Sequence, residues 1–397
     1  MSTPPRYVVI GGGIIGLAVA DRIAMARPTA RITVIEKEDR WAAHQTGRNS
    51  GVVHSGLYYK PGSYKATMCR AGAESMIGFA QQNDVAVERC GKLVVATSAD
   101  QLPRLRALAD RGKQNGLNVR ELDRSAAREI EPHVECVAAL HVPETGIIDY
   151  RGVCAALVRR LTDHGADLRL STAVLGLQPG RRATVVQTAA GEFDADGVVN
   201  CAGLQSDLVA RLAGDRSQAR IIPFRGEYFE LRPERHHLVR SLIYPVPDPL
   251  FPFLGVHLTR MIGGGVHAGP NAVLALAREG YRWRTVRPAE LAGTLGYPGF
   301  WRLAARHAKA GATEIARSLS RHRFAESLRA LVPEIADADL VPAPAGVRAQ
   351  AVLRDGSLVD DFLVERAGRV VHVLNAPSPA ATSAFEIAKR VESLLPA

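Results

Sequence analysis

Apolar and polar positions in the first 36 residues predict a strand, a turn, a helix and a second strand. Residues 7–10 are an apolar run with two adjacent valines, which predicts a buried strand. Residues 14–26 carry apolar side chains at near-helical spacing, and residues 31–35 have the pattern of a second strand that ends at Glu36. Three glycines separate the first strand from the helix. The pattern therefore predicts a strand–turn–helix–strand unit with a carboxylate at its end.

The rest of the chain alternates between helical and strand patterns, which is typical of an α/β fold. Helical patterns cover residues 63–83, 102–115, 122–130, 150–164, 275–331 and 380–394. Strand patterns cover residues 92–96, 168–170, 184–188, 192–194, 197–203, 224–231, 256–265 and 370–374. We expect the two strands between residues 184 and 194 to form a hairpin, and the strand at 197–203 to return to the first sheet.

The turn after the first strand has the spacing of a dinucleotide-binding motif. Gly11, Gly13 and Gly16 form G-x-G-x-x-G, and Glu36 follows the last glycine by 20 residues. Gly11 permits a tight turn, Gly13 lets the backbone approach a pyrophosphate, and Gly16 lets helix and strand pack closely. The helix N-terminus offers N–H groups to the pyrophosphate, and Glu36 can accept hydrogen bonds from ribose hydroxyls. This order of elements favours a dinucleotide site over a simple glycine-rich loop.

Length and composition narrow the class of protein. The chain has 397 residues, 47% of them hydrophobic and 6% aromatic, which suits a two-domain α/β enzyme. No apolar run reaches the roughly 20 residues that span a bilayer. Residues 1–6 show no signal-peptide pattern, so we expect a cytoplasmic protein. The five cysteines form no C-x-x-C pair, so we expect neither a metal site nor a disulfide framework.

The positive charge of the chain is concentrated in one region. Lys and Arg number 50 against 40 Asp and Glu, which gives a net charge of +10. Eleven Lys or Arg and four Glu lie between residues 278 and 329, so this stretch holds seven of the ten excess charges. Such an excess suits nucleic acid, an anionic membrane surface or an anionic substrate. Because the charge is local and no RNA-binding module is recognisable, we expect no nucleic-acid partner.

Several segments together resemble one known family. They are Gly11–Gly16 with Glu36, HQTGRNSGVVHSGLYY at 44–59, NCAG at 200–203, PFRGEYF at 223–229, PFLGVHLTR at 252–260, AGVRAQAV at 345–352 and NAPSPAATSA at 375–384. By these segments the chain resembles the FAD-dependent L-2-hydroxyglutarate oxidases and dehydrogenases of the glycine-oxidase and D-amino-acid-oxidase-like superfamily. The resemblance runs from about residue 6 to the end of the chain.

The resemblance implies FAD as cofactor and a small dicarboxylic hydroxy acid, L-2-hydroxyglutarate, as substrate. The product would be 2-oxoglutarate, and the electrons would pass to a quinone, another carrier or oxygen. The implied fold is α/β and D-amino-acid-oxidase-like. It has a Rossmann-like FAD-binding domain of residues 1–85, 150–215 and 340–397 and a substrate domain, built on an antiparallel sheet, of residues 86–149 and 216–339. An amine or amino-acid oxidase on the same scaffold is one alternative, because a flavin and an arginine suit both reactions. A flavin-containing RNA-modifying protein is a further alternative, suggested by the positive charge of the chain.

The resemblance also implies which residues contact the cofactor. The small, glycine-rich run after Glu36 can pass beneath a long cofactor. The start of the helix at 380–394 is expected to aim N–H groups at the pyrimidine edge of the flavin, although an ordinary capped helix is the alternative. The expected cofactor-binding residues are Gly11, Gly13, Ile14, Ile15, Gly16, Glu36, Thr46, Asn49, Ser50, Gly51, Val52, Ala202, Gly203, Ser378, Ala380, Ala381 and Thr382.

Oxidation of a hydroxy acid needs a base for the hydroxyl proton and a cation for the carboxylate. His54 lies in the glycine-rich run and is expected to be the base, with a covalent anchor to the flavin as the alternative. Arg348 stands between small residues and is expected to bind a carboxylate with its planar fork. An ion pair of Arg348 with Asp360 or Asp361 is the alternative.

Further substrate contacts are expected from three other residues. His257 alternates on a predicted strand and can face the site or be a hydrogen-bonded core histidine. Tyr59 and Lys60 can supply additional donors to the second carboxylate. Arg225 is a weaker candidate because Glu227, two residues away, can neutralise it.

The basic region contains a pattern that suits a membrane surface. Within residues 300–311, apolar positions recur at helical spacing beside a basic face. The apolar positions are Trp301, Ala304, Ala305 and Ala308, and the basic positions are Arg302, Arg306 and Lys309. Such a helix can lie among anionic headgroups, so we expect peripheral contact with the inner face of the cell membrane, close to a quinone pool. The alternative is a helix packed on the substrate domain with a solvated basic face.

Overall fold

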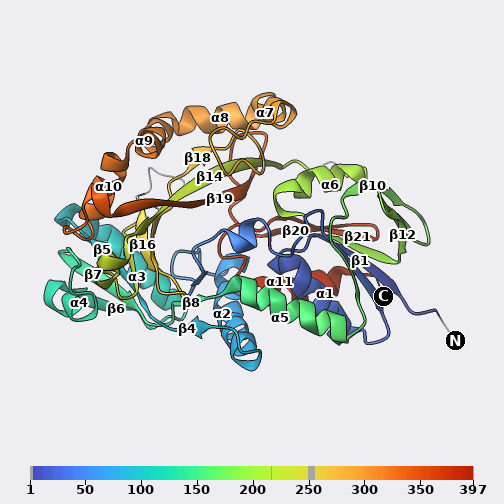
Figure 1. The fold of residues 1–397 in the computed structure, drawn as a ribbon, viewed down its shortest axis with the longest axis horizontal. Helices are drawn as coiled ribbons and strands as arrows, with labels where there is room; N and C mark the ends of the chain where they lie inside the picture. Colours follow the sequence, from blue (N-terminus) through green and yellow to red (C-terminus); the bar gives the residue numbers. More distant parts are fainter. Residues whose placement is uncertain (1–2, 216, 249–254, 397) are drawn as a thin grey trace.

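The computed structural model describes residues 3–215, 217–248 and 255–396 and contains two large sheets with helices around them (Figure 1). The first unit forms as the pattern predicts. β1 (Arg6–Ile10), α1 (Ile14–Ala26) and β2 (Arg31–Ile35) follow one another, and the two strands pair in parallel. Residues 252–254 of the PFLGVHLTR motif lie outside the described residues, as do 1–2, 216 and 397.

The first sheet has six strands in the order β20-β21-β13-β1-β2-β9. Its other strands are β9 (Asp167–Arg169), β13 (Gly197–Asn200), β20 (Leu363–Ala367) and β21 (Val370–Asn375). All neighbours are parallel except β20 with β21. Because β13 pairs with β1, the strand expected at 197–203 does return to the first sheet. The strand order switches beside β1, and α/β sheets bind ligands at such a switch point.

Helices and a small sheet cover the two faces of the first sheet. Its core on one side is shared with α1, α2 (Tyr64–Gln82), α5 (Tyr150–Asp163) and α11 (Ala384–Leu394). α1 contacts both α5 and α11, which explains why it is apolar almost all round. The other face packs against α6 (Ser206–Leu212) and the strands β10 (Val174–Pro179), β11 (Thr184–Thr188) and β12 (Gly191–Ala195). The pairing of β11 with β12 confirms the expected hairpin.

The second large sheet is mainly antiparallel. Nine strands take part, in the order β18-β14-β17-β16-β15-β5-β7-β6, with β19 paired to β14. They are β5 (Lys92–Ala96), β6 (Arg120–Asp123), β7 (Ala138–Val142), β14 (Arg220–Leu231), β15 (Leu242–Pro245), β16 (His257–Arg260), β17 (Val266–Gly269), β18 (Val273–Leu274) and β19 (Leu340–Val352). Only β15 and β5 pair in parallel among the described strands of this sheet. The fold is therefore the expected α/β fold with an antiparallel second layer.

The long antiparallel pair of β14 and β19 sets the position of Arg348, one of the expected site residues, relative to β14. Phe224 lies opposite Arg348, and Gly226 lies opposite Gly346. A Cβ added at Gly346 would lie 2.5 Å from the backbone oxygen of Arg48, so a glycine is needed where the loop after β2 approaches this strand. A third, small sheet of β3 (Val52–Val53), β8 (Gly146–Ile148) and β4 (Val87–Glu88) lies beside the same loop.

Four helices form a layer on the outer side of β14, β18 and β19 (Figure 1). We call α7 (Pro288–Leu295), α8 (Pro298–Arg306), α9 (Ala308–Leu319) and α10 (Arg321–Arg329) the helical layer. The expected helical region at 275–331 is wrong in its first part, because α7 begins at Pro288, where a proline at the first helical position loses no needed hydrogen bond. The single helix expected at 300–311 is also wrong, since α8 ends at Arg306 and α9 begins at Ala308.

Two further boundaries differ from the pattern. The strand expected at 256–265 ends at Arg260, because Gly263–Gly265 make a turn into β17; the Met261 N–H bonds to the Gly265 oxygen at 2.7 Å. The helix expected at 122–130 is α4 (Arg124–Ile130), which follows β6, and α3 (Leu102–Gln114) agrees with its expected range. No helix in the described ranges is both long and apolar enough to cross a bilayer.

Candidate active site

One large cavity is lined by residues of both large sheets. Its volume is about 1590 Å³, which exceeds the roughly 300–1,000 Å³ of pockets that hold drug-sized ligands. Gly11, Gly13 and Glu36 line one end. His54, His257 and Arg348 line the other end. A cavity of this size accommodates a dinucleotide cofactor together with a small substrate.

The glycine turn has the geometry that a dinucleotide site requires. Gly11 has a φ of +112°, a conformation that favours glycine. A Cβ added at Gly16 would lie 1.9 Å from the Gly11 oxygen, so α1 can pack on the turn because residue 16 has no side chain. The buried Glu36 carboxylate accepts hydrogen bonds from the N–H groups of Gly12 at 2.7 Å and Glu38 at 2.9 Å. Turn, helix start and acid are therefore held together, and the donors and acceptors present fit an adenine dinucleotide.

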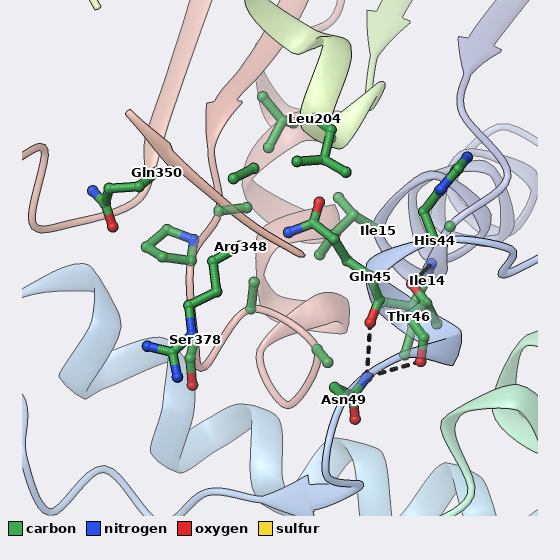
Figure 2. A pocket seen from close by; sticks show the side chains of 18 of the residues that line it. Ile14, Ile15, His44, Gln45, Thr46, Asn49, Leu204, Arg348, Gln350 and Ser378 are labelled. Carbon is green, nitrogen blue, oxygen red and sulfur yellow. Dashed lines mark hydrogen bonds between the residues drawn. The ribbon is translucent and has the colours of Figure 1, made fainter. Parts of the chain in front are cut away.

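The loop after β2 folds across the N-terminus of α1. The Ile14 N–H donates to the Thr46 hydroxyl at 3.1 Å, while the following first-turn N–H groups have no partner within the helix. The Asn49 side-chain amide donates to the carbonyl oxygens of Gln45 at 3.1 Å and Thr46 at 2.8 Å (Figure 2). Hydrogen bonds within the loop therefore hold its conformation. The N–H groups that remain at the N-terminus of α1 are available to bind a phosphate.

Most of the residues expected to bind the cofactor line the cavity. They are Gly11, Gly13, Ile14, Ile15, Glu36, Thr46, Asn49, Ser50, Val52, Ala202, Gly203, Ser378, Ala380, Ala381 and Thr382. Gly16 and Gly51 shape the backbone instead. Gly51 has a φ of +64°, and a Cβ there would lie 2.9 Å from the Ile148 oxygen. Two of the expected contacts are therefore structural glycines.

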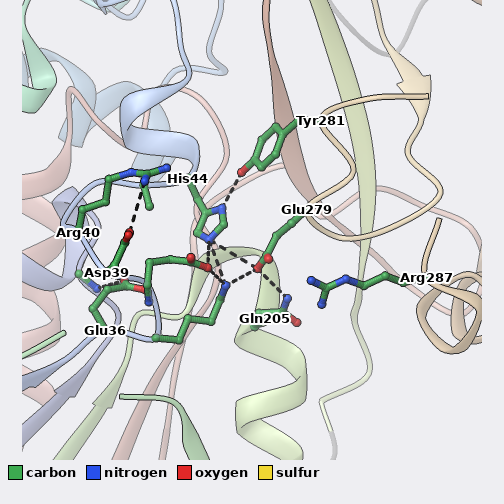
Figure 3. Close-up of polar contacts among 12 residues, drawn as sticks. Glu36, Asp39, Arg40, His44, Gln205, Glu279, Tyr281 and Arg287 are labelled. Atoms are coloured by element: carbon green, nitrogen blue, oxygen red, sulfur yellow. Dashed lines mark hydrogen bonds and ion pairs between the residues drawn. The ribbon is translucent and has the colours of Figure 1, made fainter. Parts of the chain in front are cut away.

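A polar cluster stands at the cavity wall next to Glu36 (Figure 3). Lys37 pairs with Glu38 and, at 2.8 Å, with Glu279. His44 bonds to Glu38 at 2.9 Å and to the Tyr281 hydroxyl at 2.7 Å. The hydrogen bond from Lys37 lowers the pKa of Glu38 to about 2. Glu38, His44 and Glu279 are spaced like metal ligands, but the Lys37 ammonium already pairs with both carboxylates. The cluster therefore ties the loop at 279–281 to the end of β2.

His54 lies at the opposite end, in the loop after β3. Its Nε2 is 3.1 Å from the Ser378 hydroxyl, and its backbone N–H donates to the Thr382 hydroxyl at 3.1 Å. The Thr382 hydroxyl is also 3.0 Å from the Tyr150 hydroxyl. These bonds join His54 to the turn before α11, although 328 and 324 residues of sequence separate the partners.

The electrostatic surroundings keep His54 neutral. Burial and, to a smaller extent, the Coulombic effects of Lys92 and His257 lower its pKa to about 3. A neutral imidazole has a free lone pair, so it can accept a proton. The lone pair is therefore available, but burial lowers the pKa of His54 well below the near-neutral value expected of a base, so its role as the base stays a prediction.

Arg348 reaches the same end of the cavity from β19. Figure 2 shows its guanidinium directed toward Ser378. The two aspartates considered as its partners are engaged elsewhere: Asp361 accepts N–H bonds from the start of α2 at 2.8 Å, and Asp360 pairs with Lys65 at 3.8 Å. Arg348 is thus placed to meet an anion in the cavity.

His257, Tyr59 and Lys60 also line the cavity. The His257 Nδ1 is 2.8 Å from the Gly255 oxygen, and its ring stacks on Tyr244 with 3.9 Å between centroids. Burial lowers the pKa of His257 to about 3. Tyr59 and Lys60 line the cavity as expected. His257 therefore has both expected features: it is hydrogen-bonded to the backbone like a core histidine, and it also faces the cavity.

Arg225 belongs to a different environment. Its side chain is 1% exposed, pairs with Glu227 at 3.1 Å and lies over the Trp283 ring at 4.1 Å. Glu227 does neutralise it, as the sequence indicated.

Several residues of the substrate end were missed in the sequence. They are Lys65, Tyr228, Tyr244 and Gln350. Tyr228 and Gln350 stand inside the PFRGEYF and AGVRAQAV motifs, so the motifs themselves could have indicated them. Tyr244 comes from a strand with no motif, and it reaches the cavity because β15 pairs beside β16.

The turn at residues 378–383 corrects the expected role of the closing helix. α11 begins at Ala384, so no helix end is aimed at the cavity from position 380. The physical reason is tertiary: the Thr382 hydroxyl bonds to Tyr150 and His54, which holds this stretch as a turn. The residues still line the cavity, but they do so through turn backbone.

Comparison with known proteins identifies the family. The family described as "FAD dependent oxidoreductase" (DAO) matches residues 6–394. A protein named L-2-hydroxyglutarate dehydrogenase from Indibacter alkaliphilus is 47% identical over 384 residues, 96% of this chain and 96% of the relative. The protein of the same name from Escherichia coli strain K12 is 44% identical over 98% of this chain and 92% of the relative.

A solved structure shows the same architecture. The dithionite-reduced, FAD-bound L-alpha-glycerophosphate oxidase of Mycoplasma pneumoniae has a TM-score of 0.82 at 20% identity and covers 100% of this chain and 95% of its own. The likeness extends over both large sheets, so it places the dinucleotide turn and the antiparallel layer in one shared fold. By sequence and fold, the chain belongs to the DAO family of FAD-dependent oxidoreductases and, within it, to the L-2-hydroxyglutarate dehydrogenases.

Proposed function

We propose that this protein is an FAD-dependent dehydrogenase that oxidises L-2-hydroxyglutarate to 2-oxoglutarate. Two relatives that bear this activity in their names align with nearly the whole chain. The structural observation that carries the proposal is that His54 and Arg348 line the same cavity as the glycine turn. A neutral base and a guanidinium are the two groups that a 2-hydroxy acid needs.

The glycine end of the cavity would hold FAD. The N-terminus of α1 with Gly11 and Gly13 would face the pyrophosphate, and Glu36 would accept hydrogen bonds from the adenosine ribose. The loop around Thr46 would cross the middle of the cofactor, and the turn at 378–383 would border the flavin. FAD, when bound, supplies the acceptor for the hydride that leaves the substrate carbon.

The protein side chains bind, orient and deprotonate the substrate. Arg348 would bind the carboxylate next to the hydroxyl carbon through two parallel N–H bonds. His54 would take the hydroxyl proton through the Ser378 hydroxyl, which lies 3.1 Å from His54 Nε2 and can pass its own proton to that nitrogen as it receives the substrate proton. His257, Tyr59 and Lys60 would contact the second carboxylate. The walls of the cavity exclude water from these contacts, which strengthens them.

An amine or amino-acid oxidase remains the second candidate, because the fold alone does not separate the two reactions. Anaerobic mixing of the FAD-loaded protein with L-2-hydroxyglutarate should bleach the flavin absorbance. The D-enantiomer and L-glutamate should bleach it much more slowly. Faster bleaching by L-glutamate or another amino acid would overturn the proposed substrate in favour of the oxidase.

We also propose a division into two discontinuous domains, with residues 1–85, 150–215 and 340–397 binding FAD and residues 86–149 and 216–339 forming the substrate domain. The six-stranded sheet draws its strands from the first set. β19 is the connecting element, because it pairs with β14 of the second sheet before the chain returns to β20 and β21. Limited proteolysis of the FAD-loaded protein should cut first between these segments.

We propose, finally, that the helical layer contacts an anionic membrane, where a quinone accepts the electrons. Of the twelve large apolar side chains that are exposed in the described residues, four lie in the helical layer and two lie in the segment just before it. These six are Trp283, Val286, Leu295, Trp301, Ile315 and Leu319. Exposed apolar side chains among an excess of basic residues are complementary to a negatively charged lipid surface.

The surface that would make this contact differs from the stripe read in the sequence. Trp301 is 57% exposed, whereas Leu303 and Ala310 are the buried positions of α8 and α9. Ala305 and Ala308 are also exposed and Ala304 is half-buried. Their methyl groups are small, so Trp301 supplies most of the apolar area of the stripe. A soluble carrier or oxygen would be the acceptor if the layer does not bind lipid.

A further inference from the structure

A buried lysine lies behind the substrate end of the cavity. Lys92 is the first residue of β5, and only 1% of it is exposed. Lysine is almost never fully buried without a partner of opposite charge. In the described part of the chain, its ammonium has no ion pair and no hydrogen bond. A charge held in this way requires an explanation that packing does not supply.

The contacts of Lys92 are aromatic. Its Nζ lies 4.4 Å from the ring centroid of Tyr58 and 5.0 Å from that of Tyr244. Tyr58 and Tyr244 both line the cavity. Tyr244 also stacks on His257 at 3.9 Å. Lys92 is therefore one aromatic layer away from the place where the substrate would lie, and a cation over a desolvated ring is favourable.

The charge of Lys92 acts on both histidines of the site. It lowers the pKa of His54 and that of His257, after the larger effect of burial. Burial lowers the pKa of Lys92 itself to about 7. The titratable or charged groups that face these three residues are Tyr58 and Tyr244 around Lys92, Cys69 from α2, and Arg348 beside His257.

We propose that Lys92 is a positioning residue of the dehydrogenase, whose positive charge, placed behind Tyr58 and Tyr244, keeps His54 free of a proton and draws the dianionic substrate into the cavity. The inference rests on the proposed role of His54 as the base. No bond forms or breaks at Lys92. Its positive charge makes protonation of His54 less favourable. It also stabilises the two carboxylates of the bound substrate.

The test compares Lys92→Met with Lys92→Arg and with a matched control, Lys113→Met, on the exposed side of α3. Each FAD-loaded protein is reduced anaerobically by L-2-hydroxyglutarate from pH 9 down to the lowest pH at which FAD stays bound, because the wild-type acid limb is expected near the pKa of His54, about 3. Without the charge, His54 takes up a proton at higher pH, so the acid limb of kred/Kd should move up by about one pH unit in Lys92→Met. The apparent Kd of the substrate should rise roughly 10-fold. Lys92→Arg and Lys113→Met should keep the wild-type limb.

Unchanged profiles and affinity in an FAD-loaded Lys92→Met protein would overturn the proposal. A second measurement on the wild type decides the matter if that variant does not fold. Calorimetric binding of 2-oxoglutarate near pH 8, in two buffers of different ionisation enthalpy, should show proton uptake, because the bound dianion returns Lys92 to its charged form. Absence of uptake would also refute it. An unaltered reduction rate in His54→Asn would instead refute the base, which is a separate outcome.

Discussion

The two ends of the cavity are built by different means. At the cofactor end, backbone groups form the binding surface, and glycines permit the close packing of turn and helix. Gly11, Gly16 and the N-terminus of α1 come from one continuous stretch. At the substrate end, side chains from separate elements converge, with His54 after β3, His257 on β16 and Arg348 on β19. Substitutions at the first end should therefore affect folding and FAD binding together, whereas substitutions at the second end should affect substrate binding and catalysis while FAD stays bound.

The largest effect is expected from Gly16→Val. The new Cβ would lie 1.9 Å from the Gly11 oxygen, a backbone atom that cannot move without opening the turn. We expect loss of bound FAD and a destabilisation of about 3 kcal/mol or more. The measurements are the ratio of flavin to protein absorbance and the Tm.

Gly78→Ala in α2 is the matched control, because no atom lies within 4 Å of its added Cβ. It should be neutral or stabilising by up to about 1 kcal/mol, since alanine favours the helix. A yellow Gly16→Val protein with the wild-type Tm would show that the turn tolerates a side chain.

At the substrate end, His54→Asn should slow flavin reduction by about 10²–10⁴-fold while FAD stays bound, because a general base contributes on that scale. Stopped-flow reduction under anaerobic conditions measures the rate. His322→Asn, exposed on α10, is the control and should leave the rate unchanged. Flavin that cannot be released by acid from the wild type, but is released from His54→Asn, would support the covalent-anchor reading instead.

Arg348→Lys should have a smaller effect that falls mainly on binding. Lysine keeps the charge but loses the planar fork, so we expect the substrate Kd to rise roughly 10–100-fold with a smaller change in the reduction rate. Arg366→Lys on the exposed strand β20 serves as control. A variant that binds L-2-hydroxyglutarate as tightly as the wild type would remove the clamp from this residue.

The pH dependence of the reaction should report the ionisation of His54 at the substrate end. The pKa of His54 is lowered to about 3 by burial, so the base is already neutral at pH 6 and loses activity only as pH falls toward that value. We expect kcat at saturating substrate, which reports the enzyme–substrate complex, to stay nearly constant from pH 8 to pH 6. In contrast, kcat/KM also includes the ionisation of Lys92, whose pKa is about 7. An acid limb of kcat centred at the ordinary histidine value of about 6.5 would contradict this expectation.

Substitutions in the helical layer are expected to have the smallest effect on the reaction in the cavity. Arg306→Glu/Lys309→Glu should reduce flotation with anionic vesicles by about 10-fold or more, since each basic residue near the surface contributes about 1 kcal/mol. The rate of flavin reduction should not change. Arg31→Glu/Arg106→Glu makes the same charge change at exposed positions outside the layer. Equal flotation of both double variants, or flotation that ignores salt, would remove the membrane contact.

The sequence by itself determined the cofactor end. The strand, the three glycines, α1, β2 and Glu36 follow one another within 31 residues, so local periodicity and spacing specify both the elements and their contacts. The β11–β12 hairpin was readable for the same reason. Motif strings also located His54 and Arg348, because each stands inside a segment of unusual composition.

Only the tertiary structure determined how the substrate end is assembled. The antiparallel register that sets Phe224 opposite Arg348, and the strands of two or three residues in the small sheet, leave no periodic signal. The start of α11 at Ala384 depends on bonds from Thr382 to distant residues, so helical spacing alone placed it four residues too early. Lys92 resembles a solvated strand end in the sequence. Its burial follows from the packing of β5 beneath Tyr58 and Tyr244, contacts that neighbouring residues in the chain cannot encode.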